Sequence, residues 1–411
     1  MKINETNDSK ILVIISVLLI FLCGFLSEEV ILIIQILLLI FAKKITMPKK
    51  IVVFFILIAF HATINIAIGN DELILMIKQL VGIFISIIYY YNTIDNMKKV
   101  DFFIDVYIKL SIFIAILCIL QQVAYVFHLN FIYDLRWIIK EQLPPSNLKY
   151  RSTAIFREPS ECALVLFPAF FLSIYYFVGK NKIIYKINKL SAFIICIAYI
   201  CTFSSAGYIG AIIGLIIIWI EYKHSLKQIG ILLVVGIVVS SLYIYIPDFR
   251  TRVDDTFKLF TDDSLHISKA NISSQTLIIN EKVALKNLIY TYGLGSGIGS
   301  HSLAYKKMIN TIDVQNVVLF LNQEDANSLL LRIVSEFGII GLLLLLAFVK
   351  KYSNLKYKSI YSTYSKMCVA YIILRMLRYG HYFNDGLWGF IIIYMMIKVL
   401  ENQEIGVKDG T

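Results

Sequence analysis

Twelve apolar runs follow one another along this chain, each close to the ~20 residues that an α-helix needs to cross the hydrocarbon of a bilayer. A soluble domain of 411 residues would not combine 58% hydrophobic with only 16% charged residues. The sequence therefore predicts an all-α polytopic membrane protein with about twelve transmembrane helices. The runs lie near residues 11–26, 29–42, 51–68, 73–91, 107–127, 159–178, 187–203, 206–220, 228–246, 327–349, 361–379 and 382–399.

Lysine clusters predict the orientation of these helices. They fall in alternate connectors, whereas the short connectors between them are acidic, as at Glu28 and Glu29 or Asp71 and Glu72. Because positive charge stays on the cytoplasmic side, both termini should be cytoplasmic. The net charge of +11 lies mostly on these lysines, which favours contact with lipid headgroups over nucleic acid.

The connectors divide the chain into three parts. Residues 1–246 should hold nine transmembrane helices and an outer loop at about 128–158. Residues 247–326 should form a large extracytoplasmic loop, and residues 327–411 three more helices and a cytoplasmic tail.

Inside the large loop, apolar residues recur at helical spacing, which predicts an amphipathic helix on the membrane surface or capping the bundle. They are Leu277, Ile278, Ala284, Leu285, Leu288, Ile289 and Tyr292. A glycine-rich turn over residues 293–299 ends this helix. It suits either a concave anion site of backbone amides or a helix stop and hinge.

On this topology all eight arginines of the chain fall at or beyond the outer face, where the positive-inside rule gives no reason for them. Guanidinium groups match phosphate with a planar fork of donors, and lysine does not replace them at such sites. Outer arginines therefore indicate an anion site. The predicted diphosphate-binding residues are Arg151, Arg332, Arg375, Arg378 and Arg250, with Arg157 beside the reacting atoms.

The segment 151–161 closes the first outer loop and enters a transmembrane run. Pro159 suits the first turn of a helix, and Glu158 would face the positive end of the helix dipole. Arg151, Arg157, Glu158 and Glu161 should therefore meet at one outer helix entrance. A capped helix with interfacial ion pairs is the structural alternative.

The other arginines have comparable alternatives. Arg332 and Glu336 lie one helical turn apart in an apolar run, where an ionisable pair is either functional or a structural i,i+4 pair. Arg375 and Arg378 suit a site or side chains that reach out to the interface. Arg250 suits a site or a solvated mixed-charge loop.

Four motifs resemble the bacterial polysaccharide polymerases and the related O-antigen ligases. Arg151, Phe156, Glu158 and Pro159 look like their arginine and Phe-x-Glu/Asn-Pro signature. Residues 204–210 are similar to their small-residue opening of a span, and residues 292–299 to their glycine-rich turn. Residues 327–330 and 336–341 resemble the Asn-Ser-x-Leu and Glu-x-Gly-x-x-Gly run that follows the large loop. The likeness covers roughly residues 150–350.

The chain departs from that pattern at two places. The superfamily often has His-Asn where this chain has Ala326 and Asn327, and Ser-Arg where it has Ser204 and Ser205. A base is therefore sought elsewhere, first at Glu158 and then at Glu161, Asp325 or His301. A partly buried carboxylate can be tuned toward neutral pH.

The resemblance implies a GT-C-like glycosyltransferase of the bacterial inner membrane. It would join oligosaccharide repeats carried on undecaprenyl diphosphate, at the outer side of that membrane, into O-antigen or capsular polysaccharide. A chain-length regulator and a flippase would be its protein partners and membrane lipids its surroundings. We expect no cofactor and no metal, because arginine can neutralise a diphosphate. The alternatives are a ligase that moves finished glycan to a lipid acceptor, a flippase or transporter, and a non-enzymatic scaffold.

Overall fold

A computed structural model of the chain describes residues 7–40, 45–144, 150–178, 187–221, 272–312, 320–353, 360–383 and 386–408, with scattered positions between 230 and 254. The elements of these residues are helices and turns, so the predicted all-α class is confirmed. The predicted apolar run at 228–246 lies largely outside the described residues.

Fourteen α-helices lie in the described residues, and every predicted run that falls among them is one of these helices. The helices are α1 (Asn7–Phe21), α2 (Glu28–Ile40), α3 (Lys49–Ala67), α4 (Leu73–Thr93), α5 (Met97–Val126), α6 (Asn130–Tyr133), α7 (Pro159–Val178), α8 (Lys189–Cys201), α9 (Ser205–Glu221), α12 (Ile272–Tyr290), α13 (His301–Met308), α14 (Leu329–Ser353), α15 (Ile360–Leu377) and α16 (Leu387–Lys408). A short 3₁₀ helix, η2 (Ile309–Thr311), follows α13.

The number of membrane spans differs from the predicted twelve. Among the described residues, five helices are long and apolar enough to cross a membrane: α3, α4, α5, α7 and α14. Four further apolar helices are too short by the same criterion. α15 is long enough but contains Lys366 and Arg375. The five helices indicate a multi-pass membrane protein, and the apolar runs overstated its spans because several of them form helices too short to cross a membrane.

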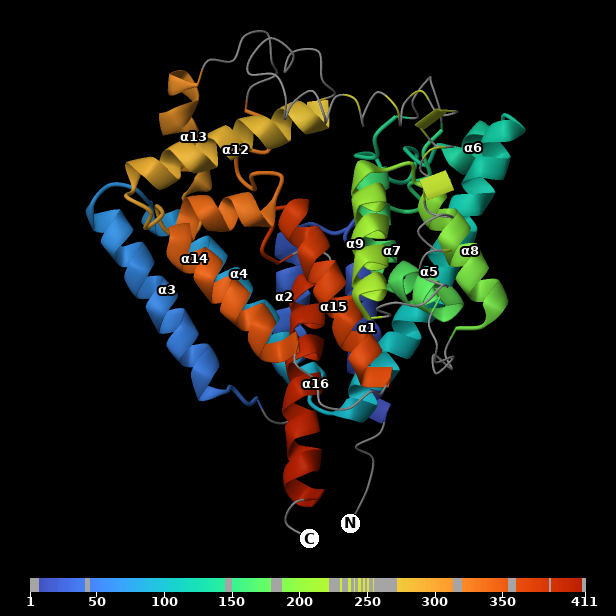
Figure 1. Cartoon of the computed structure of the whole chain (residues 1–411), viewed down its shortest axis with the longest axis horizontal. Helices are drawn as coiled ribbons and strands as arrows, with labels where there is room; N and C mark the ends of the chain where they lie inside the picture. Colours follow the sequence, from blue (N-terminus) through green and yellow to red (C-terminus); the bar gives the residue numbers. More distant parts are fainter. Residues whose placement is uncertain are drawn as a thin grey trace.

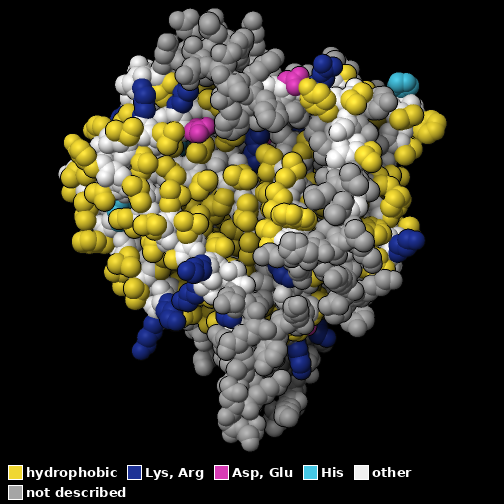
Figure 2. All heavy atoms as spheres, viewed as in Figure 1, with side chains coloured by type: hydrophobic (Ala, Val, Ile, Leu, Met, Phe, Trp, Pro, Cys, Tyr) yellow, Lys and Arg dark blue, Asp and Glu magenta, His cyan; other side chains and the backbone are white. Residues whose placement is uncertain are grey.

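Helix α7 lies at the centre of the bundle. Most of its side chains are buried, and it packs against α5, α8, α9 and α15. It begins at Pro159 as predicted, because proline lacks the amide that a first helical turn leaves unbonded. At the periphery, α3 leaves most of its apolar side chains exposed. Figure 2 shows hydrophobic side chains over the middle of the molecule and lysine or arginine toward both ends.

The first residues of α1 and the last of α16 lie at the same end of the bundle, as predicted for the two termini (Figure 1). The lysine-bearing starts of α3 and α5 and the end of α14 lie there too. Helices α12 and α13 lie at the opposite end, which we call the outer end (Figure 1). Because the predicted cytoplasmic lysines gather away from it, the outer end corresponds to the predicted exterior.

Helix α12 crosses the outer end of the bundle and packs on α13 and α14 (Figure 1). Its predicted existence is confirmed. Leu285 and Ile289 are exposed, whereas Asn280 and Asn287 are buried against the protein. Apolar side chains lose nothing when they face lipid, whereas polar groups there need partners within the protein. The packed face of α12 therefore combines Asn280 and Asn287 with apolar residues such as Ile279 and Val283.

Candidate functional site at the outer end of the bundle

Helix α14 is broken near its outer end. Gly338 has φ 60° and ψ −147°, which interrupts the helical backbone and leaves carbonyl groups without helical partners. The glycine-rich turn supplies those partners. The amide of Ser296 donates to the carbonyl of Ser335 at 3.1 Å, and that of Gly297 to the carbonyl of Glu336 at 2.9 Å. In return, the amide of Ile339 donates to the carbonyl of Gly293.

This pairing decides between the two interpretations of the glycine-rich turn. The turn does use positive φ, at Gly293, Gly295, Gly297 and Gly299. However, the amides of Ser296 and Gly297 are engaged by α14, so they are not available to an anion. The turn is a helix stop that seals the break in α14.

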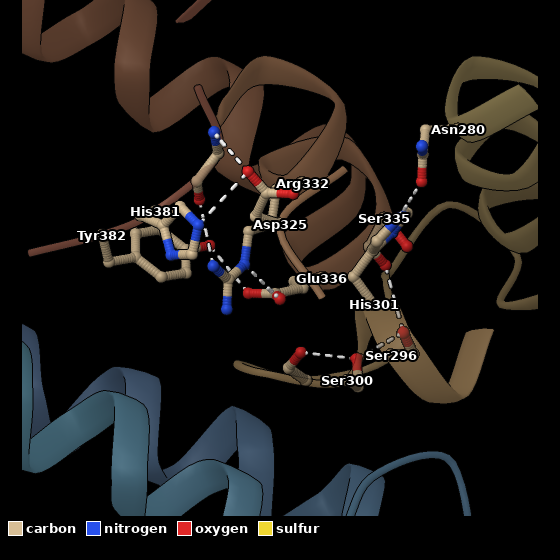
Figure 3. Close-up of polar contacts among 12 residues, drawn as sticks. Asn280, Ser296, Ser300, His301, Asp325, Arg332, Ser335, Glu336, His381 and Tyr382 are labelled. Carbon is tan, nitrogen blue, oxygen red and sulfur yellow. Dashed lines mark hydrogen bonds and ion pairs between the residues drawn. The ribbon is translucent and has the colours of Figure 1, made fainter. Parts of the chain in front are cut away.

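Arg332 lies six residues before Gly338 and is 3% exposed. Its Nε donates to Oε1 of Glu336 at 2.8 Å, and its guanidinium lies 4.3 Å from the centre of the Tyr382 ring. The hydroxyl of Tyr382 donates to the second carboxylate oxygen of Glu336 at 2.7 Å. The predicted i,i+4 pair therefore exists, and it is buried against a tyrosine from the connector between α15 and α16 (Figure 3).

The carbonyl groups of that connector also bind a second arginine, Arg375 of α15. Arg332 Nη1 donates to the carbonyl of Gly380 at 3.0 Å, and Arg375 Nη2 donates to the next carbonyl, that of His381, at 2.9 Å. Arg378 donates to the hydroxyl of Ser273 at 3.1 Å. The structure thus gathers Arg332, Arg375 and Arg378 around one connector at the outer end.

Asp325 fixes the approach to α14. Its carboxylate accepts hydrogen bonds from the side chain of Asn322 at 3.0 Å and the amides of Asn327 at 3.2 Å and Gly380 at 3.3 Å. Ser328 and Tyr379 form an isolated parallel bridge beside it. Asp325 therefore ties the loop before α14 to the connector after α15, which is a positioning role rather than that of an unoccupied base.

His381 lies between two carboxylates. Its Nδ1 is 2.8 Å from Oε1 of Glu28, and its Nε2 is 3.5 Å from Oδ2 of Asp325. The side chain remains 34% exposed. Burial and the Arg332 charge push the pKa of His381 down, but the hydrogen bond that His381 donates to Glu28 and the charges of both carboxylates outweigh them, and the net shift is upward.

Glu28 begins α2, and the turn that precedes it links His381 to the first outer loop. Arg157 donates from Nε to the carbonyl of Gly24 at 3.2 Å and lies at the same distance from a carboxylate oxygen of Glu141. A Cβ on Gly24 would lie 2.7 Å from the carbonyl of Ile155, so only glycine allows this close approach. The turn from Gly24 to Glu28 therefore contacts both the segment of Arg157 and the connector of His381.

The two carboxylates of the 151–161 segment, Glu158 and Glu161, are half-buried. Glu158 accepts a hydrogen bond from the hydroxyl of Ser160 at 2.7 Å, and Glu161 accepts from the amide of Arg157 at 3.1 Å. Both carboxylates thus serve the start of α7, as the helix-capping alternative expects. Arg151 lies in the same segment and is half-buried.

Two predicted site residues have other surroundings. His301 is fully buried with Nε2 3.0 Å from the side-chain oxygen of Asn280, and burial, aided by the charge of Arg332, lowers its pKa to about 3. A neutral imidazole of so low a pKa is a poor general base at neutral pH. Arg250 is exposed, lies 3.8 Å from Asp254 and stacks near Tyr243, so its described contacts are with its own segment, as the mixed-charge alternative expects.

Sequence reasoning missed four participants. Glu28 was noted only as an acidic outer connector, and His381, Tyr382 and Gly380 were not among the predicted site residues. Glu28 could have been noticed from its place on the outer side next to a glycine-containing turn. Its pairing with His381 could not, since 353 positions separate them and only the packed bundle joins them.

Asp71 is a further buried acid, in the connector between α3 and α4. Its Oδ1 accepts from the amide of Glu72 at 2.8 Å, but no donor among the described residues reaches Oδ2, against which Gly297 packs. Burial raises the pKa of Asp71 from 3.8 to about 7, with smaller contributions from the charges of Glu336 and Glu72. A carboxyl without a partner for its charge favours the protonated form.

We expect Asp71→Asn to stabilise the protein above pH 7. The unfolded chain loses this proton near pH 3.8 and the folded chain near pH 7, so the contribution of Asp71 to stability falls as the pH rises between these values. The variant should remove a penalty on the order of 2–4 kcal/mol at pH 8 and flatten the pH dependence. Thermal unfolding in detergent at pH 5 and pH 8 measures it. The substitution Glu72→Gln at the exposed neighbour is the control. An equal change in melting temperature between pH 5 and pH 8 in the wild type and both variants would contradict the expectation.

Comparison with known proteins gives no relative: no family model, no curated protein and no solved structure matches this chain. Within the described residues, no group of three or more histidine, cysteine, aspartate or glutamate side chains could hold a metal ion.

Proposed function

We propose that this protein is an outer-face glycosyltransferase that polymerises oligosaccharide repeats carried on a polyprenyl diphosphate, undecaprenyl diphosphate in bacteria. One observation carries the proposal. Arg332, Arg375 and Arg378 gather around a single connector at the outer end, beside an imidazole and carboxylates. Such a set combines cations for a diphosphate with groups that can take a proton.

The chemistry requires both parts. An acceptor hydroxyl of one repeat attacks the anomeric carbon of another, a carbon–oxygen bond forms, and the bond to the diphosphate breaks. The diphosphate leaves with the electron pair, and a base takes the hydroxyl proton. Fixed guanidinium groups screened from water would stabilise the charge that develops on the leaving group. Arg157 and Arg151, across the turn that contains Gly24, would bind the second diphosphate.

The broken helix α14 is the one feature that favours a transporter, because such proteins use broken helices to bind substrates and ions near the middle of the membrane. In this protein the carbonyls that the break exposes at Ser335 and Glu336 accept hydrogen bonds from the glycine-rich turn. They are therefore not open to an ion, and the break contributes to the outer-end cluster rather than to a pathway. This supports the enzyme over the flippase.

Purified protein in lipid vesicles, supplied only with lipid-linked repeat units, tests the proposal. We expect a ladder of polymers. A product formed only when a second lipid acceptor is added would identify a ligase, and movement of the repeat unit across the bilayer without transfer would identify a flippase; either result would overturn polymerisation.

Arg378→Lys should lower the rate of polymerisation about 100-fold in the same assay, because lysine keeps the charge but loses the fork of donors. Arg136→Lys is the matched control. Arg136 is also one of the arginines predicted for the outer face, but its side chain is exposed and pairs with Asp134 at 2.6 Å. Its substitution should therefore leave the rate of polymerisation unchanged. Equal rates in the two variants would contradict a diphosphate site at Arg378.

A further inference from the structure

The imidazole of His381 occupies a position that the chemistry of the proposed reaction requires. Its two nitrogens face two carboxylates, Glu28 from the start of α2 and Asp325 from the approach to α14. Figure 3 shows His381, Asp325 and Arg332 directed toward one another. The side chain of His381 is also 34% exposed, whereas that of His301 is fully buried.

The two carboxylates are not equivalent. The Glu28 oxygen lies at hydrogen-bond distance, 2.8 Å, from Nδ1, so Glu28 holds the tautomer with the proton on Nδ1. The Asp325 oxygen lies 3.5 Å from Nε2 and already accepts the amide of Gly380. In this tautomer Nε2 carries a lone pair, and a proton that arrives there gains a nearby negative charge.

Resting on the proposed function, we infer that His381 is the general base of glycosyl transfer, with Glu28 as the residue that positions it. Nε2 of His381 takes the proton of the acceptor hydroxyl as the new carbon–oxygen bond forms and the diphosphate departs. The resulting imidazolium lies between Glu28 and Asp325. The inference replaces the four candidates that the sequence suggested, since Glu158 and Glu161 serve the start of α7, Asp325 is occupied by donors and His301 is buried.

The neighbouring charges predict how the site responds to pH. Glu28 from α2 and Asp325 before α14 favour the protonated imidazole, Arg332 from α14 disfavours it, and Arg375 from α15 bonds the carbonyl of His381 itself. Only the neutral imidazole can accept a proton. The rate should therefore rise with pH along a limb that reports the pKa of His381, which lies above its ordinary value of 6.5.

The first measurement is a titration that does not depend on activity. The chain has six histidines, and in protein labelled with ¹⁵N-histidine the signal of His381 is the one that His381→Asn removes. We expect a pKa above 6.5 in the wild type and a lower pKa in Glu28→Gln, where burial and Arg332 remain but the charge of Glu28 is lost. A wild-type value at or below 6.5, or no shift in Glu28→Gln, overturns the arrangement.

The second measurement is the rate of polymerisation against pH in vesicles. His381→Asn should lower the rate 10²- to 10⁴-fold, about the range that a general base contributes, and abolish the rise of the rate with pH. Glu28→Gln should move the limb to lower pH, which a merely structural role would not do. His128→Asn, at an exposed outer position with φ 58° that asparagine adopts easily, is the control and should match the wild type.

The outcomes separate the inference from the function on which it rests. Wild-type protein that makes no polymer refutes the proposed function, whatever the titration gives. Wild-type polymer with an unchanged rate in His381→Asn refutes only the role of His381. If thermal unfolding shows that His381→Asn is poorly folded, the rate of His381→Ala with added imidazole is measured instead. A rate restored by the free base supports the role of His381 as general base, and a rate that imidazole leaves unchanged overturns it.

Discussion

Glu336→Gln is expected to unfold or strongly destabilise this protein, by about 3–5 kcal/mol. Arg332 and Glu336 are 3% and 0% exposed and joined at 2.8 Å. The substitution leaves the guanidinium of Arg332 buried without the charge that balances it, and the cost of an uncompensated buried charge exceeds that of a lost hydrogen bond. Thermal unfolding of the purified variant in detergent, together with its abundance in membranes, measures the loss.

Two further variants make this expectation specific. Arg332→Met combined with Glu336→Met removes both charges, so it should recover much of the stability but none of the polymerisation, because the arginine is gone. Asp95→Asn is the matched control. Asp95 and Lys99 form an i,i+4 pair of almost the same length, 2.9 Å, but more exposed, so its loss should hardly move the melting temperature. Equal losses at the two pairs would show that burial does not decide the effect.

Gly338→Ala is the second substitution with a large expected effect. The backbone at Gly338 has φ 60° and ψ −147°, a region that only glycine adopts readily. A Cβ would also lie 2.0 Å from the carbonyl oxygen of Gly293, which is bonded to Ile339 across the break. Strain and collision together should cost more than about 3 kcal/mol, and the fraction of folded protein in membranes should fall sharply.

Two other glycines divide this effect into its parts. Gly69 has φ 76° but nothing within 4 Å of a Cβ, so Gly69→Ala reports the backbone strain alone, about 1 kcal/mol. Gly214 lies in α9 with ordinary contacts to Phe171, so Gly214→Ala should be neutral or stabilising. If Gly338→Ala costs no more than Gly69→Ala, the close fit between the glycine-rich turn and α14 is wrong.

The candidate site shows how far residue types can be read without a fold. The arginines predicted for the outer face indicated which end of the molecule holds the candidate site. The pairing of Arg332 with Glu336 followed from their spacing on one helix. The partners of Arg332 in other segments could not be predicted from the sequence. Gly380 and Tyr382 belong to a different connector, and only its return to the outer end brings them to Arg332.

The sequence by itself determined the class of the protein, the positions of most helices and the common side of the two termini. These properties depend on local hydrophobicity and on charges next to each apolar run, which act along the chain without reference to distant segments. Residue counts therefore sufficed, although they overstated the number of spans.

Only the tertiary structure decided which face of α12 packs, what the glycine-rich turn bonds and which imidazole meets the carboxylates. Each of these depends on contacts between segments far apart in sequence, such as Glu28 with His381 and Gly297 with Glu336. In a membrane protein the apolar pattern cannot predict such contacts, because lipid and protein interior are equally apolar. The polar groups that must find partners inside the bundle select them instead.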